Sequence, residues 1–339
     1  LNAIWGEEFN SFDGVTLDIP IDTNLRGTPV WYDWCRFNMD RVTDWFAFLK
    51  NEVRKHDADA KVHIKLIPSQ LTSGLRSHGL DFETLVCLQD IIGCDAKITN
   101  ALTRMDSDKW NERYACQWRG LSMAYDFFTS ISPEKLLFDS EFHGISTVHW
   151  RDPDMTPEYV RCIYWLAHLH GMGMNSTWYW GRDADGSPKR NSIDGFHGST
   201  LTQPRVLNAI GRTMKELNAF APEVVALATE PKQVRLFYSE TAAIQDGRYM
   251  DRVYETYKTL YHQGLPLGFV TGRMLSEADE ETLDEWATVI VSHAGHVTAK
   301  EIQALARYLS QGGTIVVSGE NSLKNDEYGR PHDTGLETG

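Results

Sequence analysis

The chain has 339 residues, of which 42% are hydrophobic and 24% are charged, so it can bury a sizeable core in one large domain or two and is not expected to be disordered. Its formal net charge of −14 disfavours nucleic acids and anionic membrane surfaces as partners, because both bind basic patches. No apolar run approaches the roughly 20 residues of a membrane helix, and five irregularly spaced cysteines without a CxxC pair predict reduced thiols rather than a zinc site.

Short apolar strands alternate with longer amphipathic helices up to about residue 225, which is typical of βα units and a mainly parallel sheet. The expected strands cover residues 1–5, 61–68, 95–100, 135–142 and 173–182. The expected helices cover residues 31–56, 81–88, 111–130, 156–171 and 201–224. Polar residues follow the strands at their carboxyl ends, where barrel enzymes build active sites, but five such units are too few to close an eight-stranded barrel.

The fourth of these helices has clear terminal signals. Thr156 is its expected N-cap, Pro157 occupies the first helical position, and Gly171 ends it.

The pattern changes near Glu230, where an open, doubly wound arrangement is predicted. Strands at residues 232–240, 267–271, 287–292 and 314–320 alternate with helices at 249–264 and 298–313. This region has no GxGxxG fingerprint and no GxSxG or cysteine-centred elbow, so we assign it neither a dinucleotide nor a nucleophile. We therefore expect two domains, residues 1–229 and 230–339.

Two of the expected strands lead into carboxylates. Glu7 and Glu8 follow AIWG, and Asp139 and Glu141 follow LLF in the stretch LLFDSEFHG. Glycosidases use two carboxyl groups that flank the scissile bond, and in retaining enzymes these lie about 5 to 5.5 Å apart. The two clusters are either ordinary polar strand exits or a catalytic pair that a barrel brings together. Their place on strands separated by two others favours the pair.

The order of these motifs resembles family 42 of the glycoside hydrolases, β-galactosidases of the clan that carries its acid/base on barrel strand 4 and its nucleophile on strand 7. WGEEFNS is similar to the family's Asn-Glu-Tyr/Phe-Gly signature on strand 4, and LLFDSEFHG to its Leu-Met-Glu-Gln segment on strand 7. STWYWGR looks like Phe-Gln-Trp-Arg on strand 8, and DGFHGS looks like the family's Glu-Lys-Phe-His-Ser/Gly segment. The likeness covers nearly the whole chain.

The resemblance implies an α/β fold with strands 4–8 of a (β/α)8 TIM barrel in residues 1–229. Residues 230–339 would be the family's trimerisation domain, which has a doubly wound, glutamine-amidotransferase-like (flavodoxin-like) fold without that activity. The resemblance further implies a homotrimer that acts on a carbohydrate without a cofactor. The zinc-cysteine cluster of some members is absent, so no metal is expected.

The resemblance also implies a catalytic pair. Glu8 would be the acid/base and Glu141 the nucleophile. Asp139 and His143 are expected to support these two residues rather than to catalyse.

Substrate contacts in the −1 subsite are implied for Trp180, Asp194 and His197, with Arg182 as a further candidate. Glu7 stands where the family has the Asn that binds the sugar 2-hydroxyl. Either the register differs by one residue and Glu7 is the acid, or the contact at the 2-position has changed. Asp194 is one methylene shorter than the family's Glu. These departures put strict galactose specificity in question more than the reaction class.

Three functions follow from this interpretation. The first is a retaining, β-galactosidase-like hydrolase that removes terminal β-D-galactosyl residues by double displacement. The second is a hydrolase of the same clan that acts on another galactan or algal polysaccharide, as an agarase does. The third is an inactive carbohydrate-binding or assembly fragment. The start of the chain has no basic region typical of a signal peptide, which favours the cytoplasm and leaves a secreted or periplasmic location open.

Overall fold

The computed structural model describes residues 1–17, 20–96, 119–142, 156–178, 181–187 and 203–332. Within them the chain has an α/β fold with two parallel four-stranded sheets. The chain separates into two compact units. The first unit comprises Leu1–Ala60, Ser73–Leu88 and Pro231–Gly339, and the second comprises Lys61–Thr72 and Gln89–Glu230. The predicted division into domains at residue 229 stays a prediction.

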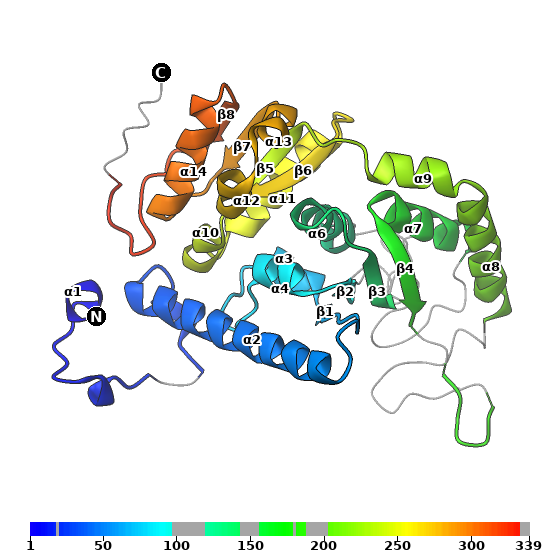
Figure 1. The fold of residues 1–339 in the computed structure, drawn as a ribbon, viewed down its shortest axis with the longest axis horizontal. Helices are drawn as coiled ribbons and strands as arrows, with labels where there is room; N and C mark the ends of the chain where they lie inside the picture. Colours follow the sequence, from blue (N-terminus) through cyan, green and yellow to red (C-terminus); the bar gives the residue numbers. More distant parts are fainter. Residues whose placement is uncertain (18–19, 97–118, 143–155, 179–180, 188–202, 333–339) are drawn as a thin grey trace, which may run out of the picture. The chain divides into compact units, whose positions relative to one another are not determined.

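The second unit is built on a sheet whose strands lie in the order β1-β2-β3-β4 (Figure 1). Its strands are β1 (Lys65–Leu66), β2 (Ile92–Cys94), β3 (Leu137–Phe142) and β4 (Met172–Thr177). Its helices are α3 (Pro68–Thr72), α6 (Ala124–Ile131), α7 (Pro157–Leu169), α8 (Pro204–Ala219) and α9 (Ala221–Ala228), with a π-helical turn at Arg119–Met123. Because the paired strands are parallel, their carboxyl ends share one edge of the sheet.

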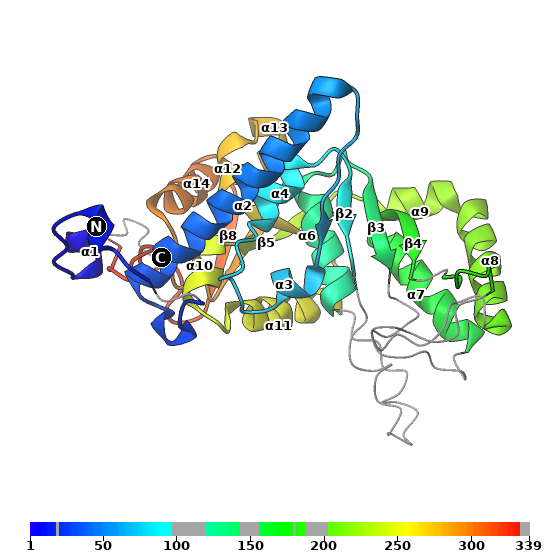
Figure 2. The same cartoon turned by 90° about the horizontal axis from the view of Figure 1, so that it is seen from below.

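Helix α7 confirms the terminal signals in the sequence. Thr156 Oγ1 accepts a hydrogen bond from the Tyr159 N–H at 3.2 Å, and Pro157 occupies the first turn. After the helix Gly171 adopts φ +98°, which favours glycine. The helix contacts both β4 and α8 (Figures 1 and 2). Its buried residues follow the helical period; they are Tyr159, Val160, Ile163, Tyr164 and Ala167.

The first unit holds the second sheet, in the order β6-β5-β7-β8. Its strands are β5 (Val234–Tyr238), β6 (Leu267–Thr271), β7 (Thr288–Ser292) and β8 (Thr314–Ser318). Its helices are α1 (Asn2–Trp5), α2 (Pro29–His56), α4 (Phe82–Leu88), α10 (Glu240–Gln245), α11 (Tyr249–Tyr261), α12 (Gly272–Glu277), α13 (Glu280–Glu285) and α14 (Ala299–Ser310), with 3₁₀ turns at Phe12–Gly14 and Thr23–Leu25. This strand order agrees with the predicted open sheet, and the glutamine-amidotransferase-like assignment stays a prediction.

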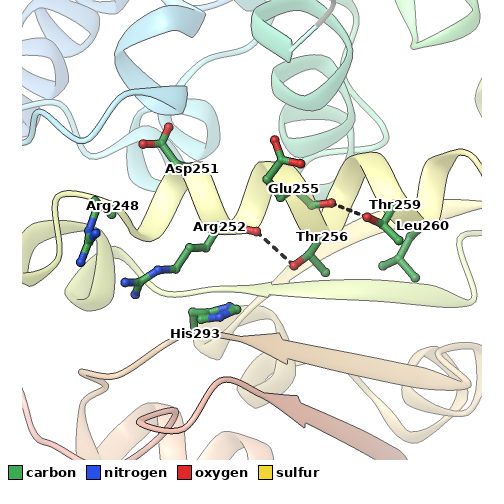
Figure 3. Close-up of a pocket in the computed structure, with 8 residues that line it drawn as sticks. All are labelled: Arg248, Asp251, Arg252, Glu255, Thr256, Thr259, Leu260 and His293. Carbon is green, nitrogen blue, oxygen red and sulfur yellow. Dashed lines mark hydrogen bonds between the residues drawn. The ribbon is translucent and has the colours of Figure 1, made fainter.

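Helix α11 and the residue after β7 line a hollow of about 450 Å³ (Figure 3). His293 has a left-handed backbone with φ +56°, and its Nδ1 lies 2.9 Å from Ser292 Oγ. Ser292 Oγ lies 2.8 Å from Thr256 Oγ1 on α11. The charged residues of the lining carry both signs; they are Arg248, Asp251, Arg252 and Glu255. This lining therefore selects neither an anion nor a cation.

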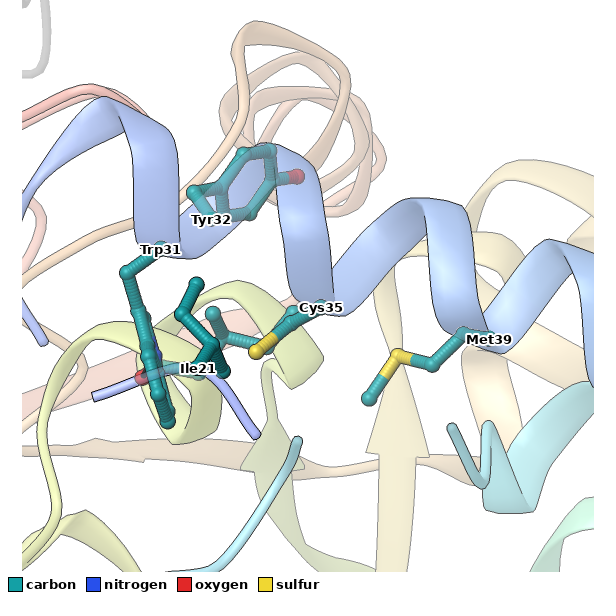
Figure 4. Close-up of a cluster of buried hydrophobic side chains, with 6 residues drawn as sticks. Ile21, Trp31, Tyr32, Cys35 and Met39 are labelled. Atoms are coloured by element: carbon teal, nitrogen blue, oxygen red, sulfur yellow. Dashed lines mark hydrogen bonds between the residues drawn. The ribbon is translucent and has the colours of Figure 1, made fainter. Parts of the chain in front are cut away.

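A cluster of buried side chains packs α2 against other parts of the first unit (Figure 4). Trp31 donates from Nε1 to the carbonyl of Ile244 at 2.8 Å. Tyr32 Oη lies 3.4 Å from Thr241 Oγ1. The other members of the cluster are Ile21, Cys35 and Met39. The fixed start of α2 matters because the segment that carries Glu7 and Glu8 is bonded to it.

Three expected strands differ from the structure. Residues 1–5 were expected to form a strand and instead form α1, closed by Gly6 in the left-handed region with φ +74°. A strand needs a neighbour for its backbone bonds, whereas the N–H groups of Ile4 and Trp5 bond to the Leu1 carbonyl. The expected strand 61–68 is limited to β1. Near the strand expected at 95–100, the described strand is β2 (Ile92–Cys94), and residues 97–100 lie outside the described residues.

The described helices include none that combines the length and the hydropathy needed to cross a bilayer.

Candidate active site

Glu141 lies near the carboxyl end of β3, a strand with a neighbour on each side. From Asp139 to Phe142, β3 advances three residues while β4 advances two, from Asn175 to Thr177. Such an irregularity aims side chains away from strict alternation and is frequent beside active sites. Accordingly, Ser140 and Glu141 are both partly buried instead of pointing to opposite faces of different exposure.

Asp139 is a buried residue of β3 that holds the backbone of Glu141. Its side chain is fully buried, and Oδ2 accepts hydrogen bonds from Tyr125 Oη at 2.5 Å and from the Ala96 N–H at 3.0 Å. Oδ1 accepts the N–H of Glu141 at 3.2 Å. Burial raises the pKa of Asp139 to about 7, against the opposing effect of these three donors. One carboxyl group therefore joins α6, the segment after β2 and the backbone of Glu141. Its expected role in support of catalysis stays a prediction.

The raised pKa of Asp139 predicts a pH-dependent stability. The pKa is about 7 in the fold and about 3.9 in an unfolded chain, so between these values the folded state holds one more proton. The free energy of unfolding should therefore fall as pH rises from about 5 to about 7, by at most about 1.4 kcal/mol per pH unit from this group. Urea titrations at several pH values measure this slope.

The matched variants are Asp139→Asn and Asp183→Asn, since Asp183 is an exposed aspartate of the same unit. Asp139→Asn should remove this part of the slope, and Asp183→Asn should keep it. Identical slopes for the wild type and Asp139→Asn would contradict the assignment.

Lys65 connects the carboxyl ends of three strands. It belongs to β1, and its ammonium group donates to Glu141 Oε2 on β3. The same Nζ lies 3.7 Å from Oδ2 of Asp95, which directly follows β2. The hydrogen bond to Glu141 raises the pKa of Lys65 above its usual value. The nucleophile candidate thus has a cationic partner held by a second carboxylate.

Glu7 and Glu8 are exposed in the loop after α1, within the first unit. Reciprocal hydrogen bonds between Asn2 and Phe9 close this loop: Asn2 Nδ2 donates to the Phe9 carbonyl at 2.9 Å, and the Phe9 N–H donates to Asn2 Oδ1 at 3.2 Å. Trp5 on α1 donates from Nε1 to Asp33 Oδ2 of α2 at 2.7 Å. Glu141 belongs to the second unit, so the pairing of Glu8 with Glu141 stays a prediction.

The substrate contacts expected at Trp180, Asp194 and His197 lie outside the described residues, as does His143. Arg182 is described and exposed, and its Nη1 donates to the Gly186 carbonyl at 2.7 Å. Its proposed contact with the sugar stays a prediction.

Sequence reasoning missed Lys65, Asp95 and Tyr125. The single usable signal was polar residues next to apolar ones at strand ends, as in HIKL and IIGCD. Neither pattern says which neighbour the side chain meets. Among the described residues, no group of three or more His, Cys, Asp or Glu side chains is arranged to hold a metal ion. The four described cysteines, Cys35, Cys87, Cys94 and Cys162, are free thiols.

The chain is similar to several known proteins in sequence and in structure. The sequence profile described as β-galactosidase, of glycoside hydrolase family 42, matches residues 1–220. An apo exo-carrageenase of family 42 from Bacteroides ovatus is 36% identical, with a TM-score of 0.90 over 100% of this chain. The β-galactosidase Gan42B from G. stearothermophilus is 18% identical, with a TM-score of 0.72 over 99% of the chain. A β-galactosidase from the Antarctic haloarchaeon Halorubrum lacusprofundi is 17% identical, with a TM-score of 0.73 over 98%.

The chain spans about half the length of these proteins, with 45%, 48% and 49% of them covered. The two likenesses below 20% identity show a shared fold and no more. A comparison with curated proteins gave no match.

Proposed function

Because the chain belongs to glycoside hydrolase family 42, we propose that it forms part of a retaining glycoside hydrolase with Glu141 as nucleophile and Glu8 as acid/base. The single observation that carries the proposal is the carboxylate of Glu141 at the irregular end of β3, positioned through its backbone by Asp139 and through its side chain by Lys65. Such a fixed carboxylate beside a lysine ammonium, at the carboxyl end of a parallel strand, suits nucleophilic attack in a barrel enzyme.

The proposed reaction has two displacements. A carboxylate oxygen of Glu141 attacks the anomeric carbon while the bond to the leaving oxygen breaks, and that oxygen takes the proton of Glu8. Glu8 then removes a proton from water, the water oxygen attacks the anomeric carbon, and Glu141 leaves as a carboxylate. Trp180, Asp194 and His197 are the proposed contacts of the sugar in the −1 subsite, and Glu7 is the proposed contact at its 2-position, or the acid in place of Glu8.

Terminal β-D-galactosyl residues are the first candidate substrate, supported by the matching family profile. A second candidate is an algal galactan of the carrageenan type. It is favoured by the 36% identity and the TM-score of 0.90 to an exo-carrageenase, compared with 18% and 0.72 for the β-galactosidase Gan42B. The replacement of the 2-hydroxyl-binding Asn by Glu7 also fits a changed sugar.

A substrate panel separates these candidates. The intact protein is assayed on aryl β-galactosides, on agarose and carrageenan oligosaccharides, and on aryl glycosides of other sugars as controls. Release of galactose from the aryl galactoside supports the first candidate, and cleavage confined to carrageenan oligosaccharides supports the second. If the intact protein binds these sugars and cleaves none of them, the proposal is contradicted and a carbohydrate-binding fragment is the better description.

We also propose the larger architecture that the family resemblance implies. Residues 1–229 would supply strands 4–8 of the TIM barrel, with β1 to β4 as strands 5–8 and α1 in the place of the expected strand 4. Residues 230–339 would supply a glutamine-amidotransferase-like trimerisation domain. The four successive parallel strands β1 to β4 and the order β6-β5-β7-β8 support this division. A monomeric mass by light scattering on the intact protein would contradict the proposed homotrimer.

A further inference from the structure

Three neighbouring strand ends bring one ammonium group between two carboxylates. Lys65 is paired with Gly93 in the β1–β2 register, and Cys94, the residue before Asp95, is paired with Asp139 in the β2–β3 register. The Lys65 ammonium donates to Glu141 and lies 3.7 Å from Asp95 Oδ2. The side chain of Asp95 is 3% exposed, that of Glu141 17% and that of Lys65 43%. The Lys65 ammonium therefore lies between the buried carboxylate of Asp95 and the more exposed carboxylate of Glu141.

The described charges around Lys65 do not favour the binding of an anionic substrate group by its ammonium. Within the described residues, one ammonium between two carboxylates gives a net charge of −1, which does not attract a further anion. The hydrogen bond to Glu141 raises the pKa of Lys65, so the ammonium stays charged at working pH. Its effect is directed at Glu141 instead, because a contacting cation favours the ionised form of a carboxyl group.

We propose that Lys65, anchored by Asp95, is a positioning residue that keeps Glu141 ionised as a nucleophile and makes it a better leaving group in the second displacement. The inference rests on the proposed function and names a residue and a step that the function itself does not specify.

The second step is where the cation has its largest effect. In the first displacement Glu141 gives an electron pair to the anomeric carbon and becomes a neutral ester. In the second, water attacks, Glu8 takes a water proton, and the electron pair of the ester C–O bond returns to Glu141. Negative charge thus reappears on Glu141 beside Lys65, and a cation at that position stabilises the transition state. Without Lys65 the ester should persist longer.

Other titratable groups surround Glu141 in the described residues. Lys65 comes from β1, Asp95 from the segment after β2, and Asp139 from β3 itself. Tyr125 of α6 donates a hydrogen bond to Asp139. Burial and the neighbouring Asp139 raise the pKa of the Cys94 thiol of β2. The sequence of β4, MGMNST, contains no charged residue. Among the described residues, Lys65 is therefore the cationic side chain in contact with Glu141. Removing its ammonium tests directly how a positive charge affects Glu141.

The experiment compares three variants of the intact protein: Lys65→Met, Lys65→Arg and Lys61→Met. Lys61 is an exposed lysine in the segment that leads into β1, and it serves as the control. The substrate is the best aryl glycoside of the panel with a good leaving group. The readouts are the pH profile of kcat/KM and the pre-steady-state burst of released aryl group. Circular dichroism checks that each variant is folded, and 43% exposure of Lys65 makes Lys65→Met compatible with folding.

Lys65→Met should move the acidic limb of kcat/KM upward by about one pH unit and slow the second step by on the order of tenfold, which gives a larger burst. Lys65→Arg should restore most of both properties because it keeps the cation, and Lys61→Met should match the wild type.

An unchanged acidic limb of the kcat/KM profile and an unchanged burst in folded Lys65→Met would overturn the inference. Equal defects in Lys65→Met and Lys65→Arg would also overturn it. Glu141→Gln separates the two proposals: if this variant were fully active, the proposed function itself would fail. If Glu141→Gln is inactive while Lys65→Met has the kinetics of the wild type, the inference about Lys65 alone fails.

Discussion

The Glu141→Gln variant of the intact protein is expected to lose activity by on the order of 10⁴-fold, because an amide cannot form the glycosyl ester on which double displacement depends. Glutamine has nearly the shape of glutamate, and the Glu141 backbone N–H can still donate to Asp139 Oδ1. The fold should therefore survive, and kcat should fall far more than KM changes. Initial rates on the best substrate of the panel measure the loss.

The control is Glu134→Gln. Glu134 is an exposed glutamate in the loop before β3, at the other end of the same strand. It should retain wild-type activity and stability. A Glu141→Gln enzyme that keeps wild-type rates would remove Glu141 from the reaction. Equal losses in both variants would point to a general effect on β3 rather than to catalysis.

Arg76→Met should have the largest effect on stability, a loss of about 3–5 kcal/mol. The Arg76 side chain is fully buried, and Nε lies 2.8 Å from Oε1 of Glu240, whose side chain is 14% exposed. Nη1 of Arg76 also donates to the carbonyls of Ser73 and Leu75, at 2.8 and 3.1 Å. Tyr238 donates to Glu240 from the other side. Removing the guanidinium leaves a buried carboxylate without its cation, and burial already raises the pKa of Glu240.

A double-mutant cycle isolates the ion pair. Arg76→Met, Glu240→Gln and the combined variant are unfolded in urea, and Arg212→Met serves as the control because Arg212 is exposed on α8. The combined variant should lose less stability than the sum of the two single variants, since neither partner is then left as an unpaired buried charge. If the stability losses of the two single variants were additive in the combined variant, the pairing of Arg76 with Glu240 would be contradicted. If Arg76→Met had the stability of the wild type, the buried position of Arg76 would be contradicted.

The elements that the sequence predicts well are those with local signals. Thr156 and Pro157 mark the start of α7, and Thr298 with Glu301 forms a capping box that starts α14. The apolar run Leu137-Phe138 begins β3, within the strand expected at residues 135–142. In each case neighbouring residues decide the backbone conformation, so no information from distant segments is needed.

The failures share a different physical origin. Residues 1–5 have strand-like composition, but a strand requires a partner that supplies backbone hydrogen bonds, and α1 satisfies those bonds locally. The contacts of Lys65 with Glu141 and of Arg76 with Glu240 join residues far apart in the chain. Such contacts depend on strand register and packing, which periodicity and composition do not encode. The candidate nucleophile was therefore predictable from its strand end, whereas the cation beside it was not.

The most direct test of the central claim is to trap the covalent intermediate. A 2-deoxy-2-fluoro glycosyl fluoride of the best substrate sugar should react with the intact protein: fluoride leaves readily, while the 2-fluorine disfavours the oxocarbenium-like transition state of the second step. Mass spectrometry of the digested protein should then find one sugar on the peptide that contains LLFDSEF, at Glu141. A label on any other carboxylate, or steady turnover without a labelled protein, would contradict the account.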